Sequence, residues 1–169
     1  MDSFNHLIMP SFKILLTITA LAAAVLTGCK EERVMPGQDY LVFGWYHGAC
    51  QGEGCVDIFK LDKNAGLLYE DSTDRYPSST APYEGQFGLT SAAQYQLVQD
   101  LPALLPHQLL TQPIGTIGQP DFADGGGYYV EITNNGQRKF WLIDTNKDNI
   151  PTYLYPFVDA LQAKIIHLQ

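Results

Sequence analysis

The sequence predicts an α+β domain, in which a mainly antiparallel sheet of about five strands, arranged as hairpins, packs two main helices on one face. Two observations support this class. Short runs rich in aromatic and β-branched residues are separated by Gly, Asn and Pro, as is typical of strands joined by tight turns. Two other segments repeat apolar residues at helical spacing, and each of them follows a group of strands.

Three strands are expected in the first part of the domain. The segments 39–48 and 55–62 are rich in Val, Ile, Phe, Tyr and Trp. The turn at 64–66 (Asn-Ala-Gly) leads into a third strand over 67–71, which would form a hairpin with the second. The segment 75–88 is rich in Pro, Ser and Gly, so we expect a loop there.

The first main helix is expected to begin at Ser91, because Gln94 three positions later can complete a capping box. Apolar residues follow at helical spacing until Pro102 interrupts the pattern. The next residues, up to 110, favour a short second helical turn.

The second half opens with a glycine-rich connection over 112–127. The strongest hairpin in the chain follows over 128–144, with an Asn-Gly pair at 135–136 that suits a two-residue turn. A last helix is expected after Asn149 as its N-cap, entered through Pro151. The helix would bury one apolar stripe. The stripe contains Leu154, Phe157, Val158, Leu161, Ile165 and Leu168.

The N-terminal 28 residues have the layout of a secretory signal. Lys13 precedes an uncharged apolar stretch over 14–28, which is shorter than the roughly 20 residues of a bilayer-spanning helix. The four residues Leu26-Thr27-Gly28-Cys29 resemble a bacterial lipobox, in which the cysteine receives a diacylglyceryl group and becomes the new N-terminus. An ordinary signal peptide with a chance cysteine is the alternative.

This resemblance to bacterial lipoproteins implies a signal peptide over 1–28, a tether over 29–38 and a single domain over 39–169. Acyl chains on Cys29, palmitate among them, would anchor the protein to a membrane of the cell envelope. The absence of an aspartate directly after Cys29 favours the outer membrane over the inner one, with the periplasmic or surface face left open. A start at Met9 would give a more compact signal.

The formal net charge of −8 argues against a nucleic-acid partner, because phosphates require clustered Lys and Arg. The membrane partner would then be contacted through the Cys29 lipid rather than through a basic surface. The chain contains no P-loop, and no GxGxxG motif opens a helix after a strand, so we expect no cofactor.

Cys50 and Cys55 are the two thiols that remain if Cys29 is lipidated. Export would place them in an oxidising compartment, so we expect a structural disulfide on the loop between the first two strands. A metal site formed by His47 and the two cysteines is an alternative. A redox motif fits less well, because four residues rather than two separate the cysteines.

Asp144, Asn146 and Asp148 alternate as in the first half of a calcium-binding loop. The pattern then departs from that loop, since Asn149 replaces the expected glycine and Tyr155 replaces the bidentate glutamate. A polar turn is therefore the preferred interpretation, with weak calcium binding as the alternative.

Asp121 and Asp124 precede three glycines. Paired carboxylates can act as acid and base when their surroundings separate their pKa values. Acidic residues beside glycines are also ordinary turn residues. The many aromatic residues could belong to the core or form a platform for a carbohydrate or peptide.

These observations favour a lipid-anchored envelope protein with a non-catalytic binding role, whose partner is a protein, peptide or carbohydrate. The alternative is a small envelope hydrolase that uses the acidic loops around Asp121, Asp124 and Asp144. An enzyme should bring at least two of these carboxylates together in a concave pocket. A binding module should instead expose an aromatic patch or a strand edge.

Overall fold

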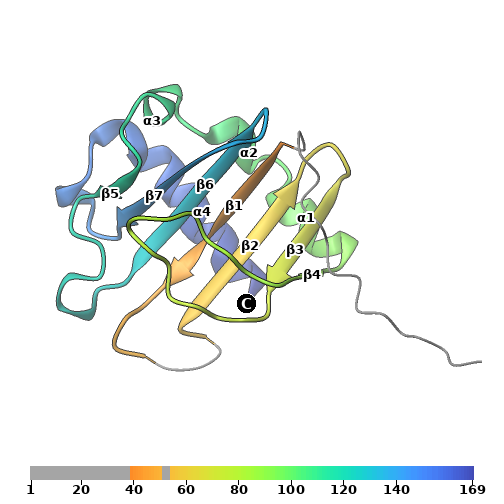
Figure 1. The fold of residues 1–169 in the computed structure, drawn as a ribbon, viewed down its shortest axis with the longest axis horizontal. Helices are drawn as coiled ribbons and strands as arrows, with labels where there is room; N and C mark the ends of the chain where they lie inside the picture. Colours follow the sequence, from red (N-terminus) through yellow and green to blue (C-terminus); the bar gives the residue numbers. More distant parts are fainter. Residues whose placement is uncertain (1–38, 51–53) are drawn as a thin grey trace, which may run out of the picture. The chain divides into compact units, whose positions relative to one another are not determined.

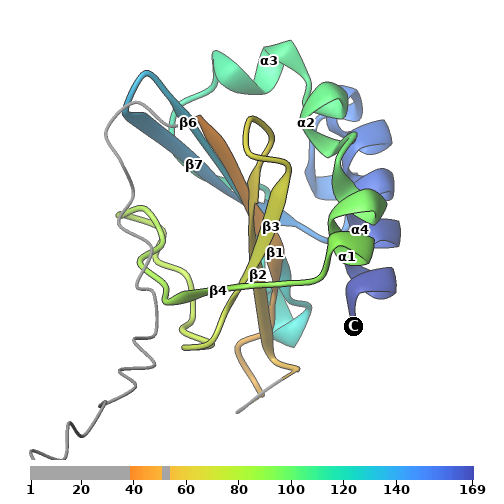
Figure 2. The ribbon, with the colours of Figure 1, turned by 90° about the vertical axis from the view of Figure 1, so that its right-hand side faces the viewer.

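The computed structural model describes residues 39–50 and 54–169, so the predicted signal peptide, Cys29 and the tether over 29–38 lie outside the described residues. In the described part, one sheet carries helices on one face and a long loop on the other (Figures 1 and 2). No helix of this part is both long enough and apolar enough to cross a bilayer.

The sheet has seven strands in the order β4-β3-β2-β1-β6-β7-β5. Their bounds are β1 (Tyr40–Tyr46), β2 (Val56–Asp62), β3 (Leu67–Asp71), β4 (Phe87–Leu89), β5 (Gly115–Ile117), β6 (Gly127–Asn134) and β7 (Gln137–Asp144). All neighbouring pairs are antiparallel except β5 and β7, which are parallel. The predicted α+β class is thus confirmed.

The five predicted strands are all present, and the two short edge strands β4 and β5 are additional to them. Asn135 and Gly136 form the predicted turn between β6 and β7, with φ values of 49° and 77°. The prediction of a loop over 75–88 is correct up to residue 86 and wrong for its last two residues, which pair with β3.

Helices cover one face of the sheet (Figure 2). They are α1 (Ala92–Val98), α2 (Leu101–Leu104), α3 (His107–Leu110) and α4 (Tyr155–Leu168), with 3-10 turns η1 (Phe122–Asp124), η2 (Lys147–Asn149) and η3 (Thr152–Leu154). The capping box at the start of α1 is confirmed, because Ser91 Oγ accepts from the Gln94 N–H while the Gln94 side chain accepts from the Ser91 N–H.

The prediction that Asn149 caps the last helix is wrong. The N-cap of α4 is Leu154, and the Asn149 side-chain amide instead donates to Asp144 Oδ2 at 2.8 Å. The predicted apolar stripe is buried as expected, with Leu154 in η3 and the other five residues in α4.

Alternation along the strands sends side chains to two separate cores. In β1, Leu41 and Phe43 pack against the helices, whereas Val42 and Tyr46 face the opposite side. That second core is covered by the loop over 72–86. This loop connects β3 to β4 along the chain and passes over the face of the sheet (Figure 1).

The loop over 72–86 is fixed to the sheet by a buried ion pair. Glu131 on β6 is fully buried and accepts from Arg138 Nε on β7 at 2.6 Å. Arg138 Nη2 also donates to the Tyr83 carbonyl at 2.6 Å, and its Nη1 pairs with Glu84 at 2.5 Å. The Tyr83 N–H donates to Tyr129 Oη at 2.8 Å, so two neighbouring residues of the loop are bound to the sheet.

A second attachment lies at the beginning of this loop. The buried carboxylate of Asp71 accepts from the Tyr83 hydroxyl at 2.6 Å and from the Gln86 N–H at 2.5 Å. It also accepts from the N–H groups of Thr73 and Asp74. These bonds connect the start of the loop with its end, so its exposed middle is held in a defined position.

Candidate functional site

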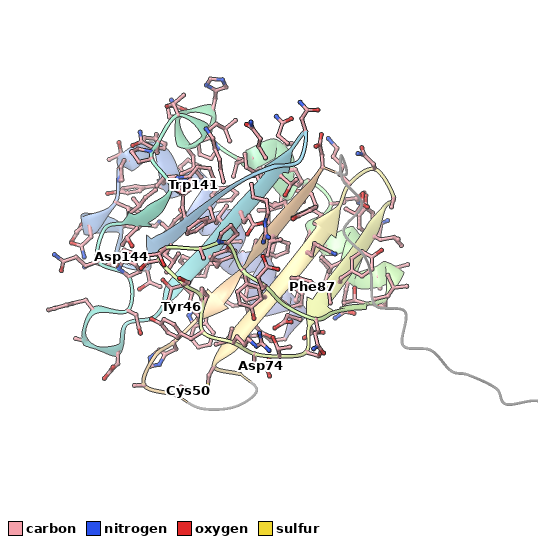
Figure 3. The ribbon with its side chains drawn as sticks, viewed as in Figure 1. Tyr46, Cys50, Asp74, Phe87, Trp141 and Asp144 are labelled. Carbon is pink, nitrogen blue, oxygen red and sulfur yellow. A yellow bond between two sulfur atoms is a disulfide. The ribbon has the colours of Figure 1, made fainter. Side chains whose placement is uncertain are left out.

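Several loops meet at the end of the sheet where β1 finishes. Antiparallel pairing places Tyr46 beside Val56 at the start of β2 and beside Gly127 at the start of β6. Figure 3 places Tyr46, Cys50, Asp74 and Asp144 at this end of the molecule. We call it the disulfide end and define it by the segments 47–50, 54–57, 71–76, 118–126 and 144–149.

The predicted disulfide is present. Cys50 and Cys55 are bonded, with 5.4 Å between their Cα atoms. The His47 N–H donates to the Cys55 carbonyl at 2.8 Å, so the backbone also closes this loop. The two sulfurs are bonded to each other, so in this form they provide no thiolate ligands beside His47. Among the described residues, no three His, Cys, Asp or Glu side chains lie close enough together to hold a metal ion.

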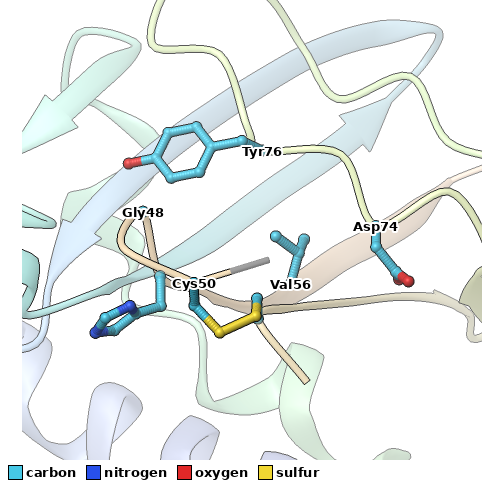
Figure 4. A pocket seen from close by; sticks show the side chains of 7 residues that line it. Gly48, Cys50, Val56, Asp74 and Tyr76 are labelled. Carbon is cyan, nitrogen blue, oxygen red and sulfur yellow. A yellow bond between two sulfur atoms is a disulfide. The ribbon is translucent and has the colours of Figure 1, made fainter. Parts of the chain in front are cut away.

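A cavity of about 530 Å³ lies between the disulfide and the loop over 72–86 (Figure 4). Tyr76 lies on one side of it and the Cys50–Cys55 bond lies on the other (Figure 4). The cavity is lined by His47, Gly48, Cys50, Cys55, Val56, Asp74 and Tyr76. It therefore combines aromatic, apolar and acidic groups from segments that are distant in the sequence.

Asp121 joins three segments next to this cavity. Its Oδ1 accepts from the N–H groups of Gly48 and Gly126, each at 3.1 Å, and its Oδ2 accepts from the Tyr76 hydroxyl at 2.8 Å. Partial burial by itself raises the pKa of Asp121, but these hydrogen bonds and the nearby His47 outweigh it and lower that pKa below its ordinary value. Asp121 is therefore a structural anion.

The loop over 118–126 has an unusual backbone. Asp121, Ala123 and Asp124 have φ values of 60°, 51° and 60°, a region that residues other than glycine rarely adopt. The N–H of Asp121 donates to the Gly126 carbonyl at 2.7 Å and closes the loop. This conformation presents Phe122 to solvent, with 74% of its surface exposed. Such strain is maintained only when surrounding contacts determine the conformation.

Asp144 holds the beginning of the same loop. Its carboxylate accepts from the N–H groups of Gln119 and Asn146 and from the Asn149 side chain, all at 2.8 Å. The Asn146 side chain accepts from the Asp148 N–H at 3.1 Å. Because the oxygens of Asp144 and Asn146 bind protein groups, the segment has the bonding of a polar turn.

The three candidate catalytic carboxylates do not meet in the cavity. Asp121 and Asp144 are bonded to opposite parts of the loop over 118–126, and Asp124 is exposed within it. None of them is among the residues that line the cavity. The arrangement thus has a structural role that the sequence pattern did not reveal.

Two buried polar atoms beside the cavity have no hydrogen-bond partner among the described residues. They are Tyr46 Oη and His47 Nδ1. Burial raises the pKa of Tyr46, whose ring contacts Tyr76 edge to face at 5.1 Å between centroids. This contact and the bond to Asp121 hold the Tyr76 ring in place, while the residue as a whole remains 51% exposed.

Sequence reasoning did not single out Tyr76 or Phe122 as functional residues. Tyr76 lies in a segment recognised only as a loop, and Phe122 is an isolated aromatic residue between two aspartates. Tyr76 is positioned by its bond to Asp121, 45 residues away, and the loop that carries Phe122 is held by bonds to Gly48 and Asp144. No local pattern could have indicated either position.

A smaller cavity of about 220 Å³ lies at the same end of the sheet, beside the C-terminal part of α4. It is lined by Trp45, Gly54, Tyr128, Gln162, Ile165, Ile166 and Gln169. The rings of Trp45 and His47 lie 5.8 Å apart between centroids, so aromatic side chains extend from one cavity towards the other.

Comparison of the chain with protein-family models, with curated proteins and with solved structures finds no match.

Proposed function

We propose that this protein is a lipid-anchored component of the bacterial cell envelope, and that its domain binds a partner without catalysis at the disulfide end. The exposed side chains of Tyr76 and Phe122 support this most directly. Both rings lie in loops fixed by Asp121, so their large contact area is presented at little entropic cost.

Binding is better supported than hydrolysis because of how the carboxylates are used. Asp121 and Asp144 each accept three hydrogen bonds from protein groups. The lowered pKa of Asp121 also makes it a poor general acid or base near neutral pH. A hydrolase would instead need carboxylates that reach a substrate in a shared cavity.

The lipid anchor is proposed from the sequence. Leu26-Thr27-Gly28-Cys29 follows an uncharged apolar stretch, as in bacterial lipoproteins. Metabolic labelling with a palmitate analogue should label the full chain and fail to label Cys29→Ala. The variant should also leave the membrane fraction, whereas labelling that persists in the variant would contradict the anchor.

The binding role is tested with the double variant Tyr76→Ala/Phe122→Ala. Full-length protein is mixed with three isolated envelope fractions: soluble periplasmic proteins, solubilised outer-membrane proteins and purified peptidoglycan. We expect retention on one fraction, with a loss of about tenfold or more in the variant. Leu104→Ala on α2 is the control, because Leu104 is also exposed but lies away from the disulfide end.

If the aromatic double variant were retained as strongly as the Leu104→Ala control, the aromatic rings would have no role in binding. Turnover of an envelope substrate that is lost in Asp121→Asn or Asp124→Asn would instead support the hydrolase.

A further inference from the structure

The two ends of the sheet differ in charge. The disulfide end contains seven aspartates, one arginine and one lysine. The opposite end, comprising Asp39 and the turn regions 62–67 and 134–139, contains two aspartates, two lysines and one arginine. Five of the seven aspartates are at least partly exposed. They are Asp57, Asp74, Asp121, Asp124 and Asp148.

The two basic residues at the disulfide end leave it with a formal charge of −5. Lys147 forms an ion pair with Asp159 on α4. Arg75 is exposed next to the cavity-lining Asp74 and Tyr76. The exposed rings of Tyr76 and Phe122 therefore lie at an end of the sheet that carries a net negative charge.

The chain enters the domain at the opposite end. Asp39, directly before β1, accepts from the Asn135 N–H at 3.0 Å, which places the start of β1 beside the β6–β7 turn. The seven residues of β1 then lead to the disulfide end, a distance of about 23 Å for an extended strand. A tether before residue 39 is thus attached away from the aromatic rings.

The sheet offers little room for a partner that adds a strand. The edge strands β4 and β5 have three residues each, and short edges disfavour strand addition. The disulfide end consists instead of loops beside the ends of β1, β2, β3, β6 and β7, so a partner there would bind without adding a strand to the sheet.

We propose that the disulfide end docks a segment of a second envelope protein that is rich in Lys and Arg. This inference rests on the proposed binding function and names the class of its partner. Phe122 and Tyr76 provide the apolar anchors, and their ring faces also attract ammonium and guanidinium groups. The surrounding aspartates supply the complementary charge, which favours rapid association with a basic surface.

The test uses full-length protein in detergent and two defined probes. The first is a set of synthetic peptides matched in length and apolar content that differ in net charge. The second is a set of soluble, uncharged glycan oligomers. Affinity for each is measured by fluorescence anisotropy at about 0.05 M and about 0.5 M salt, because added salt weakens attraction between exposed charges.

We expect affinity to rise with the positive charge of the peptide and to fall with added salt. Phe122→Ala should weaken binding about tenfold or more. Asp124→Asn should weaken it less and reduce its dependence on salt, because this change removes one charge and keeps a residue that tolerates positive φ. Asp100→Asn on the helical side, which removes the same charge, is the control and should bind as the parent chain does.

Other outcomes overturn the inference in different ways. If affinity does not change with the net charge of the peptide, the proposal of a basic partner is wrong. Glycan binding that is lost in Phe122→Ala would reject it too, while leaving the proposed binding function intact. Binding of neither probe, together with unchanged retention of the aromatic double variant on envelope fractions, would reject both proposals.

Discussion

Asp121 joins three separate segments at the disulfide end through a single carboxylate. Its partners Gly48 and Tyr76 lie 73 and 45 positions away in the sequence, and Gly126 lies in its own loop. Hydrogen bonds to an ionised acceptor are stronger than neutral ones. Loss of this carboxylate should therefore loosen the cavity wall and both exposed rings together.

Asp121→Asn should reduce the free energy of unfolding at pH 7 by about 1–3 kcal/mol, because the bonds to a charged acceptor are lost. The pKa of Asp121 is lowered in the folded protein, so its charge stabilises the fold above the ordinary unfolded value of about 3.9. That contribution is lost as the pH falls from there through the lower folded value. Urea unfolding at several pH values should show parent and variant converging in this acidic range.

Asp124→Asn is the matched control for this prediction. Asp124 lies in the same loop with the same φ of 60°, and its side chain is exposed. We expect a change in stability within about 0.5 kcal/mol at pH 7. If Asp124→Asn destabilised the protein as much as Asp121→Asn, the three hydrogen bonds would not explain the effect.

At the scale of elements, the disulfide connects the end of β1 to the start of β2. In the chain-entropy model, cross-linking a loop of this length lowers the entropy of the unfolded chain and so stabilises the folded state by about 2 kcal/mol. Cys50→Ala/Cys55→Ala should lower the free energy of unfolding by about that amount, as measured by urea unfolding. A reductant should produce a similar loss in the parent and none in the variant.

The Glu131–Arg138 pair fixes the loop over 72–86, and its removal can be tested with a double-mutant cycle. Burial alone lowers the pKa of Arg138, but hydrogen bonds from its guanidinium to Glu131 and the charge of that residue outweigh this effect and raise the pKa. Arg138→Met would leave the carboxylate buried and uncompensated, at a cost of about 3–5 kcal/mol. Urea unfolding measures this loss, and proteolysis within the loop should become faster.

Glu131→Gln/Arg138→Met should recover part of that stability, because it removes the buried charge as well. If the single and double variants were equally unstable, the packing of the Arg138 side chain rather than its pairing would fix the loop.

Elements with a complete local signal could be predicted from the sequence. The Asn135-Gly136 turn and the Ser91–Gln94 capping box each depend only on residues that are close in the sequence, and both are confirmed. The strands β4 and β5 could not be predicted, since each consists of three residues that pair with distant partners. The prediction of an N-cap at Asn149 was wrong because the side-chain amide of Asn149 instead donates a hydrogen bond to Asp144, five positions earlier.

The candidate site was predictable only in part. The disulfide followed from the sequence of the loop and the expected export of the chain. The roles of Asp121 and Asp144 did not, because paired aspartates beside glycines look the same whether they bind a ligand or the protein's own N–H groups. Distinguishing these cases requires the long-range bonds that the fold creates.

Asp39, where the chain enters the domain, and the exposed aromatic rings lie at opposite ends of the sheet. This separation should determine how the domain is oriented on a membrane surface. The acidic disulfide end should be repelled by an anionic membrane surface, while Asp39, the described residue nearest the proposed lipid anchor, lies at the less acidic end. In lipidated protein on anionic vesicles, a lipid-attached quencher should therefore reduce the emission of a fluorophore at Lys63 more than one at Asp148. Both residues are exposed, at opposite ends of the sheet.

Lipid-free Cys29→Ala protein should show little quenching at either position, which serves as the control. Equal quenching at both positions of the lipidated protein would mean that the domain has no preferred orientation.

The central position of β1 also dictates when the domain can assemble. β1, the first strand of residues 39–169 to emerge from the ribosome, has β6 as one of its two neighbours, with Tyr40 opposite Thr133. The clamp on the loop over 72–86 needs Arg138, and the loop that carries Phe122 needs Asp144. Nearly the whole chain must therefore be synthesised before the fold can close. If the protein is exported unfolded, as the proposed signal peptide implies, this delay keeps the chain competent for translocation until the β6–β7 hairpin has been made.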